Sequence, residues 1–363
     1  MPQPALDIRI PGLVPGDGLP EGTEAWLRRV GVGGPFTFEA LAGGRNNRVY
    51  RVGAGRRSYL LKHYFTHEDD SRDRLGTEFG FLSFLWKWGV RTVPRPLGCN
   101  RRLDLGLYEF ITGEKIGPGE PSLDHVLEAV RFVVHINRYR DHPEAWDLPV
   151  ASEAGFSLNE HIDRVERRLS DLDRVSGEDQ VTAEAAAFIR NELRPAWREV
   201  ETGCRQRAHR LGLDPAEVLS RKARRLSPSD FGFHNALVEP GGRLRFLDFE
   251  YAGWDDPAKL ICDFFRRPGV RAPRRYVSEF VHHVSADRDE EEALRSRVRL
   301  LLPVSAVKWC GLILNDFLSA PNRRRSFARP DSLLERRRSQ LDRARKYLAQ
   351  VKLDMEGAAD GLR

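Results

Sequence analysis

The residues best suited to chemistry lie in one stretch of the chain, residues 226–250, where polar residues follow short apolar runs. Asn235 comes five positions after Asp230, and Asp248 follows the next apolar run. An Asp, an Asn and a second Asp that converge can hold Mg²⁺ and orient a hydroxyl or amine against a phosphoryl group. Each of the three is also typical of a turn or a strand end when taken alone. Their significance therefore depends on what lies upstream.

A lysine upstream lies within an apolar run that is typical of a strand. Lys62 falls inside residues 58–64, and burying it is costly unless it is paired or contacts an anion. Alternation along the strand also allows it to face solvent. Glu78 on the following helix is the expected partner, since Glu68 comes too soon after the strand. A Lys–Glu pair can hold the ammonium against the α- and β-phosphates of a nucleotide.

A glycine-containing turn precedes this lysine. Gly43 and Gly44 begin the turn and Asn46 and Asn47 end it, between two strand-like runs. Glycines at such a position allow backbone N–H groups to approach phosphates closely. A simple two-glycine hairpin is the alternative interpretation.

The secondary structure expected to position these residues changes along the chain, from mostly strands to mostly helices. Strands are expected at 36–41, 48–52, 58–64, 93–98 and 105–111, with turns at 53–57 and 99–102, and helices at 23–30 and 69–88. These segments form a small, mostly antiparallel sheet with one helix. Beyond Gly113 the expected elements are mainly helices, at 122–139, 158–175, 183–210, 214–219, 259–266, 274–285, 290–318 and 332–351.

Length and composition indicate a globular protein of two lobes. The chain has 363 residues, 40% hydrophobic and 31% charged, and no run approaches the roughly 18 apolar residues that span a membrane. The N-terminus carries no signal-peptide pattern, and the four cysteines form no CxxC pair, so we expect a cytoplasmic protein without a zinc site or disulfides.

The net charge of +6 does not indicate a nucleic-acid-binding protein. The basic residues at 164–168, 221–225 and 336–345 lie in helix-like segments, most of them with acids interspersed, which is typical of solvated helical faces. A positive field also suits an anionic substrate such as a nucleotide.

The order of these parts resembles the aminoglycoside phosphotransferase-like family, which includes choline and homoserine kinase relatives. The similarity covers roughly residues 36–320. It rests on the segments Leu41-Ala-Gly-Gly-Arg-Asn-Asn-Arg-Val-Tyr-Arg-Val52, Leu60-Leu-Lys62, Thr77-Glu78, Val93-Pro-Arg-Pro96, Leu107-Tyr-Glu-Phe-Ile-Thr-Gly113, Ser229-Asp230, Asn235-Ala-Leu-Val238, Phe246-Leu-Asp-Phe-Glu250 and Asp256-Pro257.

The resemblance implies an α+β, bilobal protein-kinase-like fold. It predicts an N-terminal arm at 1–34, a nucleotide-binding N-lobe at 35–111, and a mostly helical C-lobe at 112–355 that holds the catalytic loop and a small-molecule acceptor. Asp230 would be the catalytic base or orienting carboxylate, and Asn235 and Asp248 would hold Mg²⁺. The residues expected to bind ATP or GTP, with the backbone of 109–111 meeting the base, are Gly43, Gly44, Asn46, Asn47, Lys62, Glu78, Glu109, Phe110 and Ile111.

One departure from the family pattern falls at the catalytic loop. The family usually has His-Gly-Asp where this chain has Pro228-Ser229-Asp230, so the loop must be braced without that histidine. We predict a kinase that phosphorylates a hydroxyl of a metabolite, sugar, amino alcohol or aminoglycoside-like acceptor, and the alternative is a catalytically weak nucleotide-binding regulatory protein of the same fold. Candidate residues for an acidic acceptor pocket are Glu160, Asp163, Asp171 and Asp173.

Overall fold

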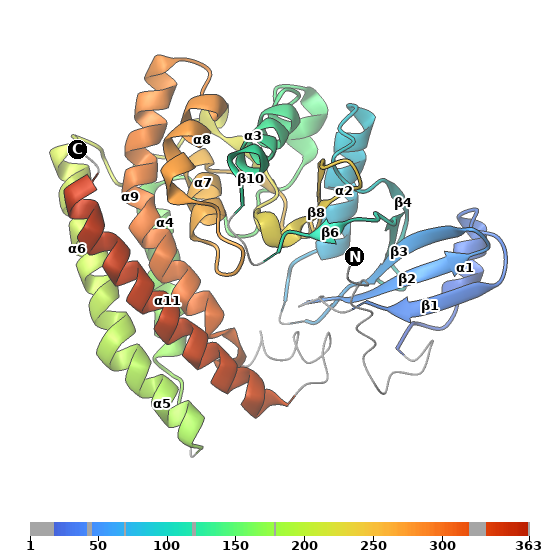
Figure 1. Ribbon diagram of the computed structural model, residues 1–363, viewed down its shortest axis with the longest axis horizontal. Helices are drawn as coiled ribbons and strands as arrows, with labels where there is room; N and C mark the ends of the chain where they lie inside the picture. Colours follow the sequence, from blue (N-terminus) through green and yellow to red (C-terminus); the bar gives the residue numbers. More distant parts are fainter. Residues whose placement is uncertain are drawn as a thin grey trace, which may run out of the picture.

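The computed structural model describes residues 18–41, 46–68, 70–117, 121–177, 179–318 and 332–361. A sheet-containing N-lobe lies at one end of the molecule and a helical C-lobe at the other (Figure 1). Helix α2 stands between the sheet and the helical part, and the long helices α6, α9 and α11 form the far side (Figure 1). This arrangement confirms the predicted bilobal α+β organisation.

The N-lobe sheet is antiparallel throughout, in the order β1-β2-β3-β5-β4. Its strands are β1 (Phe36–Ala40), β2 (Arg48–Ala54), β3 (Arg57–His63), β4 (Pro96–Asn100) and β5 (Leu105–Glu109). Helix α1 (Thr23–Arg29) packs on the sheet, where Trp26 and Leu27 share a buried cluster with Val52, Leu61 and Leu107. This packing fixes β3, the strand that carries the predicted lysine.

The turn between β4 and β5 was predicted at the wrong place. It lies at 101–104 rather than 99–102, because the side chain of Asn100 accepts hydrogen bonds from the backbone N–H groups of Arg102 (3.1 Å) and Leu103 (3.2 Å). Asp104 completes the turn in the left-handed region, at φ 51°. Asn and Asp are the residues that most readily close such turns.

Helix α2 (Arg74–Lys87) begins five residues later than predicted. The Asp73 carboxylate accepts a hydrogen bond from the Gly76 N–H at 2.8 Å and so caps the helix. Gly89, at φ 82°, follows the last turn. The late start leaves Glu78 within the first two turns, facing the sheet.

The C-lobe consists of helices around two small sheets. The helices are α3 (Leu123–Asn137), α4 (Leu158–Leu172), α5 (Gln180–Phe188), α6 (Arg194–Arg210), α7 (Pro257–Arg266), α8 (Val277–Val284), α9 (Arg288–Ile313) and α11 (Leu333–Gly361). The strands are β6 (Glu114–Lys115), β7 (Arg225–Ser227), β8 (Ala236–Val238), β9 (Leu244–Phe246) and β10 (Gly253–Asp255). Helix α9 packs against α4, α6, α7 and α11.

One helix prediction in the C-lobe was incomplete and another was wrong. Residues 183–210 are helical throughout, as predicted, but a π-helical segment, Ile189–Leu193, joins α5 to α6 just before Pro195, which lacks a backbone N–H to donate. Residues 214–219 form a turn instead of a short helix. The Asp214 carboxylate accepts the N–H of Ala216 at 2.9 Å and so favours the turn.

An aromatic cluster supports the loops that carry the polar residues. Phe132 of α3 stacks on Phe246 of β9 with ring centroids 4.4 Å apart. Phe231 lies 5.3 Å from Phe246 and 5.0 Å from Phe264 of α7. Because all four rings are buried, they hold the segments on either side of Asp230 and Asp248 against a rigid base.

Among the described helices, none is long and apolar enough to cross a membrane.

Candidate active site

Lys62, Glu78 and Asp248 meet in one buried ion-pair cluster. Lys62 Nζ lies 2.8 and 2.9 Å from the two oxygens of Glu78 and 2.9 Å from Oδ1 of Asp248. Burial opposes the charged form of Lys62, but the carboxylates of Asp248 and Glu78 outweigh it and raise the lysine pKa. The ammonium is therefore charged at the junction of the two lobes. The predicted Lys62–Glu78 pair is present, and Glu68 is exposed.

The Glu78 carboxylate is fixed by further donors. It accepts hydrogen bonds from the hydroxyl of Tyr64 at 2.6 Å and from the backbone N–H of Phe249 at 3.2 Å. The hydroxyls of Tyr64 and Tyr108 lie 2.8 Å apart, so the donor itself is held in place. Glu78 thus links Lys62 of β3 to Phe249, the residue that follows Asp248.

The asparagines that end the glycine turn contact Glu250. Asn46 Nδ2 donates to one Glu250 oxygen at 2.6 Å, and Asn47 Nδ2 donates to the other at 2.5 Å. Arg74 of α2 lies 3.8 Å from the same carboxylate. Burial and nearby Asp248 raise the pKa of Glu250, whereas Lys62 and Arg74 oppose that rise. Gly43 and Gly44 lie outside the described residues.

The loop before Asp230 is braced without the family histidine. The Asn137 side chain donates to the carbonyl of Leu226 at 3.0 Å and accepts from its N–H at 2.8 Å, which anchors β7 to α3. Ser227 Oγ accepts the N–H of Ser229 at 2.9 Å. Ser229 itself has φ 64°, a left-handed conformation, at the position where the family usually has glycine. Side-chain hydrogen bonds from neighbouring elements therefore hold the loop.

Asp230 faces the cleft and has basic neighbours. Its carboxylate forms an ion pair with Arg267, which follows α7, and lies 3.5 Å from His234 Nε2. Asn235 Nδ2 donates to the backbone carbonyl of Asp230 at 3.0 Å. The side chain of Asp230 is 22% exposed, so an acceptor hydroxyl can reach it.

Asn235 and Asp248 lie on adjacent segments. The N–H of Leu247 donates to the carbonyl of Asn235 at 2.8 Å, and Asp248 follows with φ 67° and a side chain that is 36% exposed. The Asn235 amide nitrogen is used by Asp230, which leaves its carboxamide oxygen as the ligating atom. One amide oxygen and one carboxylate fit the preference of Mg²⁺ for oxygen donors supplemented by water and phosphate. No cluster of three His, Cys, Asp or Glu side chains that could hold a metal alone occurs in the described parts of the chain.

The predicted hinge follows β5. The Glu109 side chain accepts the N–H of Arg95 at 3.1 Å and pairs with Arg245 at 2.9 Å, so it ties the hinge to β9. The guanidinium of Arg51 lies 5.0 Å from the centroid of the Phe110 ring. Ile111 is buried.

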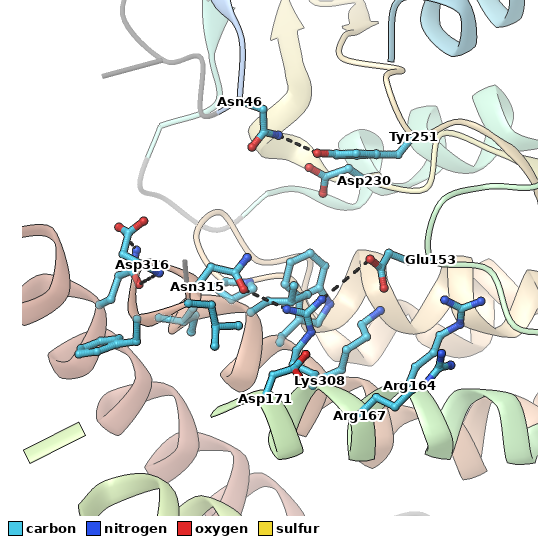
Figure 2. A pocket seen from close by; sticks show the side chains of 18 of the residues that line it. Asn46, Glu153, Arg164, Arg167, Asp171, Asp230, Tyr251, Lys308, Asn315 and Asp316 are labelled. Carbon is cyan, nitrogen blue, oxygen red and sulfur yellow. Dashed lines mark hydrogen bonds and ion pairs between the residues drawn. The ribbon is translucent and has the colours of Figure 1, made fainter. Parts of the chain in front are cut away.

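A large cavity lies on the C-lobe side of these residues. It has a volume of about 1310 Å³ and is bounded by the catalytic loop, α4, α9, α11 and the end of the glycine turn. Asp230 and Tyr251 lie on one side of it, and Arg164 and Lys308 lie across from them (Figure 2). Trp309 of α9 lines it.

Sequence reasoning missed several residues of this region. It did not find Asn137, Arg267 or Glu153, and it did not place the arginines at 164–168 beside a cavity. Arg164, Arg167 and Arg168 all line the cavity. Their spacing of three and four positions places them on one side of a helix, which was the available signal.

Comparison with known proteins agrees with this geometry. The pattern of the phosphotransferase enzyme family matches residues 37–301. No curated protein sequence is significantly similar to the chain.

Three solved structures are similar in fold. Spectinomycin phosphotransferase APH(9)-Ia in complex with ADP and spectinomycin has 12% identity and a TM-score of 0.59 over 87% of this chain and 98% of its own. Choline kinase from Cryptosporidium parvum Iowa II has 12% identity and a TM-score of 0.53 over 89% and 91%. The ethanolamine kinase of Plasmodium vivax has 16% identity and a TM-score of 0.52 over 85% and 81%.

These likenesses confirm the predicted kinase-like fold. With the family pattern covering most of the sequence, the predicted class, a small-molecule phosphotransferase, is confirmed as well, and the chain belongs to the phosphotransferase enzyme family.

Proposed function

We propose that this protein transfers the γ-phosphoryl group of ATP to a hydroxyl group of a small molecule in a Mg²⁺-dependent reaction. The observation that most directly supports this proposal is the contact of Lys62 with both Glu78 and Asp248. This contact joins the N-lobe to the segment that follows the catalytic loop. The similar fold of a phosphotransferase solved with ADP and spectinomycin supports a nucleotide and a small acceptor as the two substrates.

Each lobe has its own task in this proposal. The N-lobe, residues 35–111, holds the nucleotide, with the arm at 1–34 preceding it, and the C-lobe, residues 112–355, holds the acceptor. The backbone of 109–111 meets the base, the turn at 43–47 approaches the phosphates, and Lys62 contacts them. This assignment places the transferred group between Lys62 and Asp230.

Asp230 orients the acceptor hydroxyl and receives its proton. A carboxylate within reach of a hydroxyl raises the nucleophilicity of the oxygen as the proton leaves. Arg267 compensates the charge of Asp230 until an acceptor enters. Asn235 and Asp248 are the residues that would hold Mg²⁺, which neutralises charge on the phosphates when bound.

The compartment we propose is the cytoplasm, where ATP and reducing conditions coexist. All four cysteines are free, and Cys204, Cys262 and Cys310 are buried. Buried thiols without disulfide partners are typical of proteins from reducing compartments.

The test is metal-dependent ADP formation with a panel of hydroxyl compounds. For any acceptor that stimulates turnover, Asp230→Asn lowers kcat by about 10²- to 10⁴-fold, the usual contribution of a general base. Asp124→Asn, at an exposed carboxylate on α3 outside the cavity, serves as the matched control and leaves kcat unchanged. Unchanged turnover in Asp230→Asn contradicts its assigned role. ATP binding without metal dependence or turnover favours the regulatory alternative instead.

A further inference from the structure

The cavity beside Asp230 is predominantly basic. Among the described residues that line it, ten are Lys or Arg and seven are Asp or Glu. The excess is notable because cavities that bind cationic amines need the opposite balance. The positions of these charges further limit which acceptors fit the cavity.

Glu153 is a carboxylate surrounded by cations. Arg72 Nη2 lies 3.2 Å from its Oε1, and Arg168 Nη2 lies 3.9 Å from the same oxygen. Burial alone raises the pKa of Glu153, but the positive charges of Arg168, Arg72, Lys308 and Arg164 outweigh burial and lower it. One carboxylate therefore faces four cations.

Lys308 shares the carboxylate of Asp263 with several other hydrogen-bond donors. Asp263 accepts hydrogen bonds from Lys308, from Ser305 Oγ at 2.9 Å and from Trp309 Nε1 at 3.0 Å. Lys259 Nζ lies 3.1 Å from the second oxygen of Asp263. Burial and the charge of Lys259 lower the pKa of Lys308, against the pull of Asp263. Lys259 also pairs with Asp255 at 2.8 Å, so the charges of the two lysines and two aspartates balance. Lys308 lines the cavity, where an anion can contact it.

Arg164 adds an unsatisfied donor to the same wall. Its guanidinium donates to the backbone carbonyl of Ala154, whereas its Nε is buried and donates no hydrogen bond within the described parts of the chain. Arg164 and Lys308 lie across the cavity from Asp230 (Figure 2). A molecule that spans the cavity can therefore present one end to Asp230 and the other to this basic wall.

The aromatic rings of the cavity are occupied by the protein's own cations. The guanidinium of Arg267 lies 4.5 Å from the centroid of the Trp309 ring, and that of Arg72 lies 5.7 Å from the centroid of the Tyr251 ring. Ring faces are the usual receptors for quaternary ammonium groups. A cationic acceptor would have to displace an arginine from each of these two rings.

The acidic residues expected to receive a polycation do not gather at the cavity. Of Glu160, Asp163, Asp171 and Asp173, only Asp171 is among the described lining residues. Asp173 is paired with Arg194, whose Nε lies 2.9 Å away. These four candidate residues therefore do not form an acidic acceptor pocket.

We infer that the acceptor carries an oxyanion, a phosphate or a carboxylate, in addition to the hydroxyl that reacts. This inference rests on the proposed function and specifies its substrate class. The oxyanion binds the wall formed by Arg164, Arg168 and Lys308, which we name the anion wall, and the hydroxyl lies at Asp230. Guanidinium groups favour both oxyanions because their paired N–H donors match two oxygens.

The reaction with such an acceptor balances without a further reactant. The acceptor oxygen forms a bond to the γ-phosphorus of ATP, and the bond from that phosphorus to the β,γ-bridging oxygen breaks. The electron pair leaves with ADP, and the hydroxyl proton passes to Asp230 and then to solvent.

The test compares sugars that share one ring and differ in charge. Glucose is neutral, glucosamine is cationic, glucose 6-phosphate carries a phosphate, and glucuronate carries a carboxylate. Two quantities are measured on the full chain: kcat/KM for ADP formation with Mg·ATP, and Kd for each sugar with Mg·ADP present, by calorimetry. We expect at least one anionic sugar to have a kcat/KM about tenfold or more above that of glucose and a Kd about tenfold or more below it, since charge-assisted hydrogen bonds are the stronger ones. The phosphate and carboxylate arms identify which oxyanion is preferred.

Variants test whether the anion wall causes the preference for an anionic sugar. Arg164→Gln and Lys308→Gln each reduce the advantage of the anionic sugar over glucose by about tenfold, and Lys308→Arg restores most of it. Arg198→Gln, an exposed residue of α6 outside the cavity, keeps the full advantage. Using the ratio of two ligands on the same variant removes any general loss of stability from the comparison.

The outcomes separate this inference from the proposed function. Best turnover or binding with glucosamine overturns the anion wall and leaves the phosphotransferase assignment intact. Tighter binding of an anionic sugar without any turnover supports the anion wall and counts against the proposed activity. If neither anionic sugar binds at about 10 mM, a weak affinity by any standard, the inference is wrong.

Discussion

Replacing Glu78 by Gln tests the contact that joins the two lobes. The substitution keeps the shape of the side chain and removes the charge that faces Lys62, which is buried. Breaking a buried ion pair from one side typically costs about 3–5 kcal/mol. We expect the lower end, about 3 kcal/mol, because Lys62 retains Asp248 at 2.9 Å and the glutamine oxygen can still accept the Tyr64 hydroxyl.

The effect on catalysis follows from the same geometry. Without Glu78, Asp248 is the nearest remaining carboxylate for Lys62. In the proposed function, the ammonium would then shift away from the phosphates and draw Asp248 from the position in which it would hold Mg²⁺. Loss of one preorganised electrostatic contact lowers kcat by about 10²- to 10³-fold. Turnover is measured as ADP formation at saturating Mg·ATP, and stability by urea unfolding.

A surface pair in the same protein provides the control. Lys87 and Glu144 lie 2.5 Å apart, with 58% and 42% of their side chains exposed. Glu144→Gln makes the same chemical change there and leaves stability and turnover unaltered, because solvent screens exposed pairs. A Glu78→Gln protein within about 1 kcal/mol of the natural chain would refute the buried-pair argument, since that is the range of exposed pairs. A Lys62→Met, Glu78→Gln double-mutant cycle should show a coupling of at least about 2 kcal/mol.

Three further predictions concern the surroundings of the site. Burial opposes ionisation of Asp256, but the hydrogen bond with His161 and the charge of Arg297 lower its pKa from 3.8 to about 2. A lowered pKa gives stability above pH 3.8 that is lost as the pH falls through 2, so Asp256→Asn should cost about 2 kcal/mol in urea unfolding at pH 7 and much less near pH 2. Ser229→Gly should stabilise the chain by up to about 1 kcal/mol in the same assay, because left-handed backbone costs a non-glycine residue about 1–2 kcal/mol and added chain entropy offsets part of the gain, whereas Ser229→Ala should give no such gain. Glu250→Gln keeps one oxygen, so either Asn46 or Asn47 loses its acceptor, and the change should cost about 2 kcal/mol, with a higher KM for ATP in ADP-formation kinetics.

The sequence predicted those parts of the site that depend on local pattern. Lys62 stood out because a charged residue interrupted a strand, and Glu78 because it lay on the next helix. Both elements formed, and the short loop between Asp230 and Asn235 brought those residues together as expected. Local periodicity and loop length determine such contacts, and both can be read from one chain.

Other contacts depend on packing between distant segments. Asn47 and Glu250 are separated by 203 positions, and their pairing requires the two lobes to be in place. Asn137 braces a strand 89 positions away, and Arg267 reaches Asp230 only because α7 packs beneath the catalytic loop. Side-chain type alone does not distinguish these residues from the many other polar residues of the chain, so sequence reasoning could not identify them.

The hydrogen bonds of Asn46 and Asn47 to Glu250 join the end of the glycine turn to the C-lobe. Separation of the two lobes would break both bonds at once. Because Glu250 lies two positions beyond Asp248, the opening movement also pulls on a residue that would hold the metal. Under the proposed function, exit of the spent nucleotide and loosening of its metal would therefore be linked, and a substitution at either asparagine would alter the timing of the catalytic cycle.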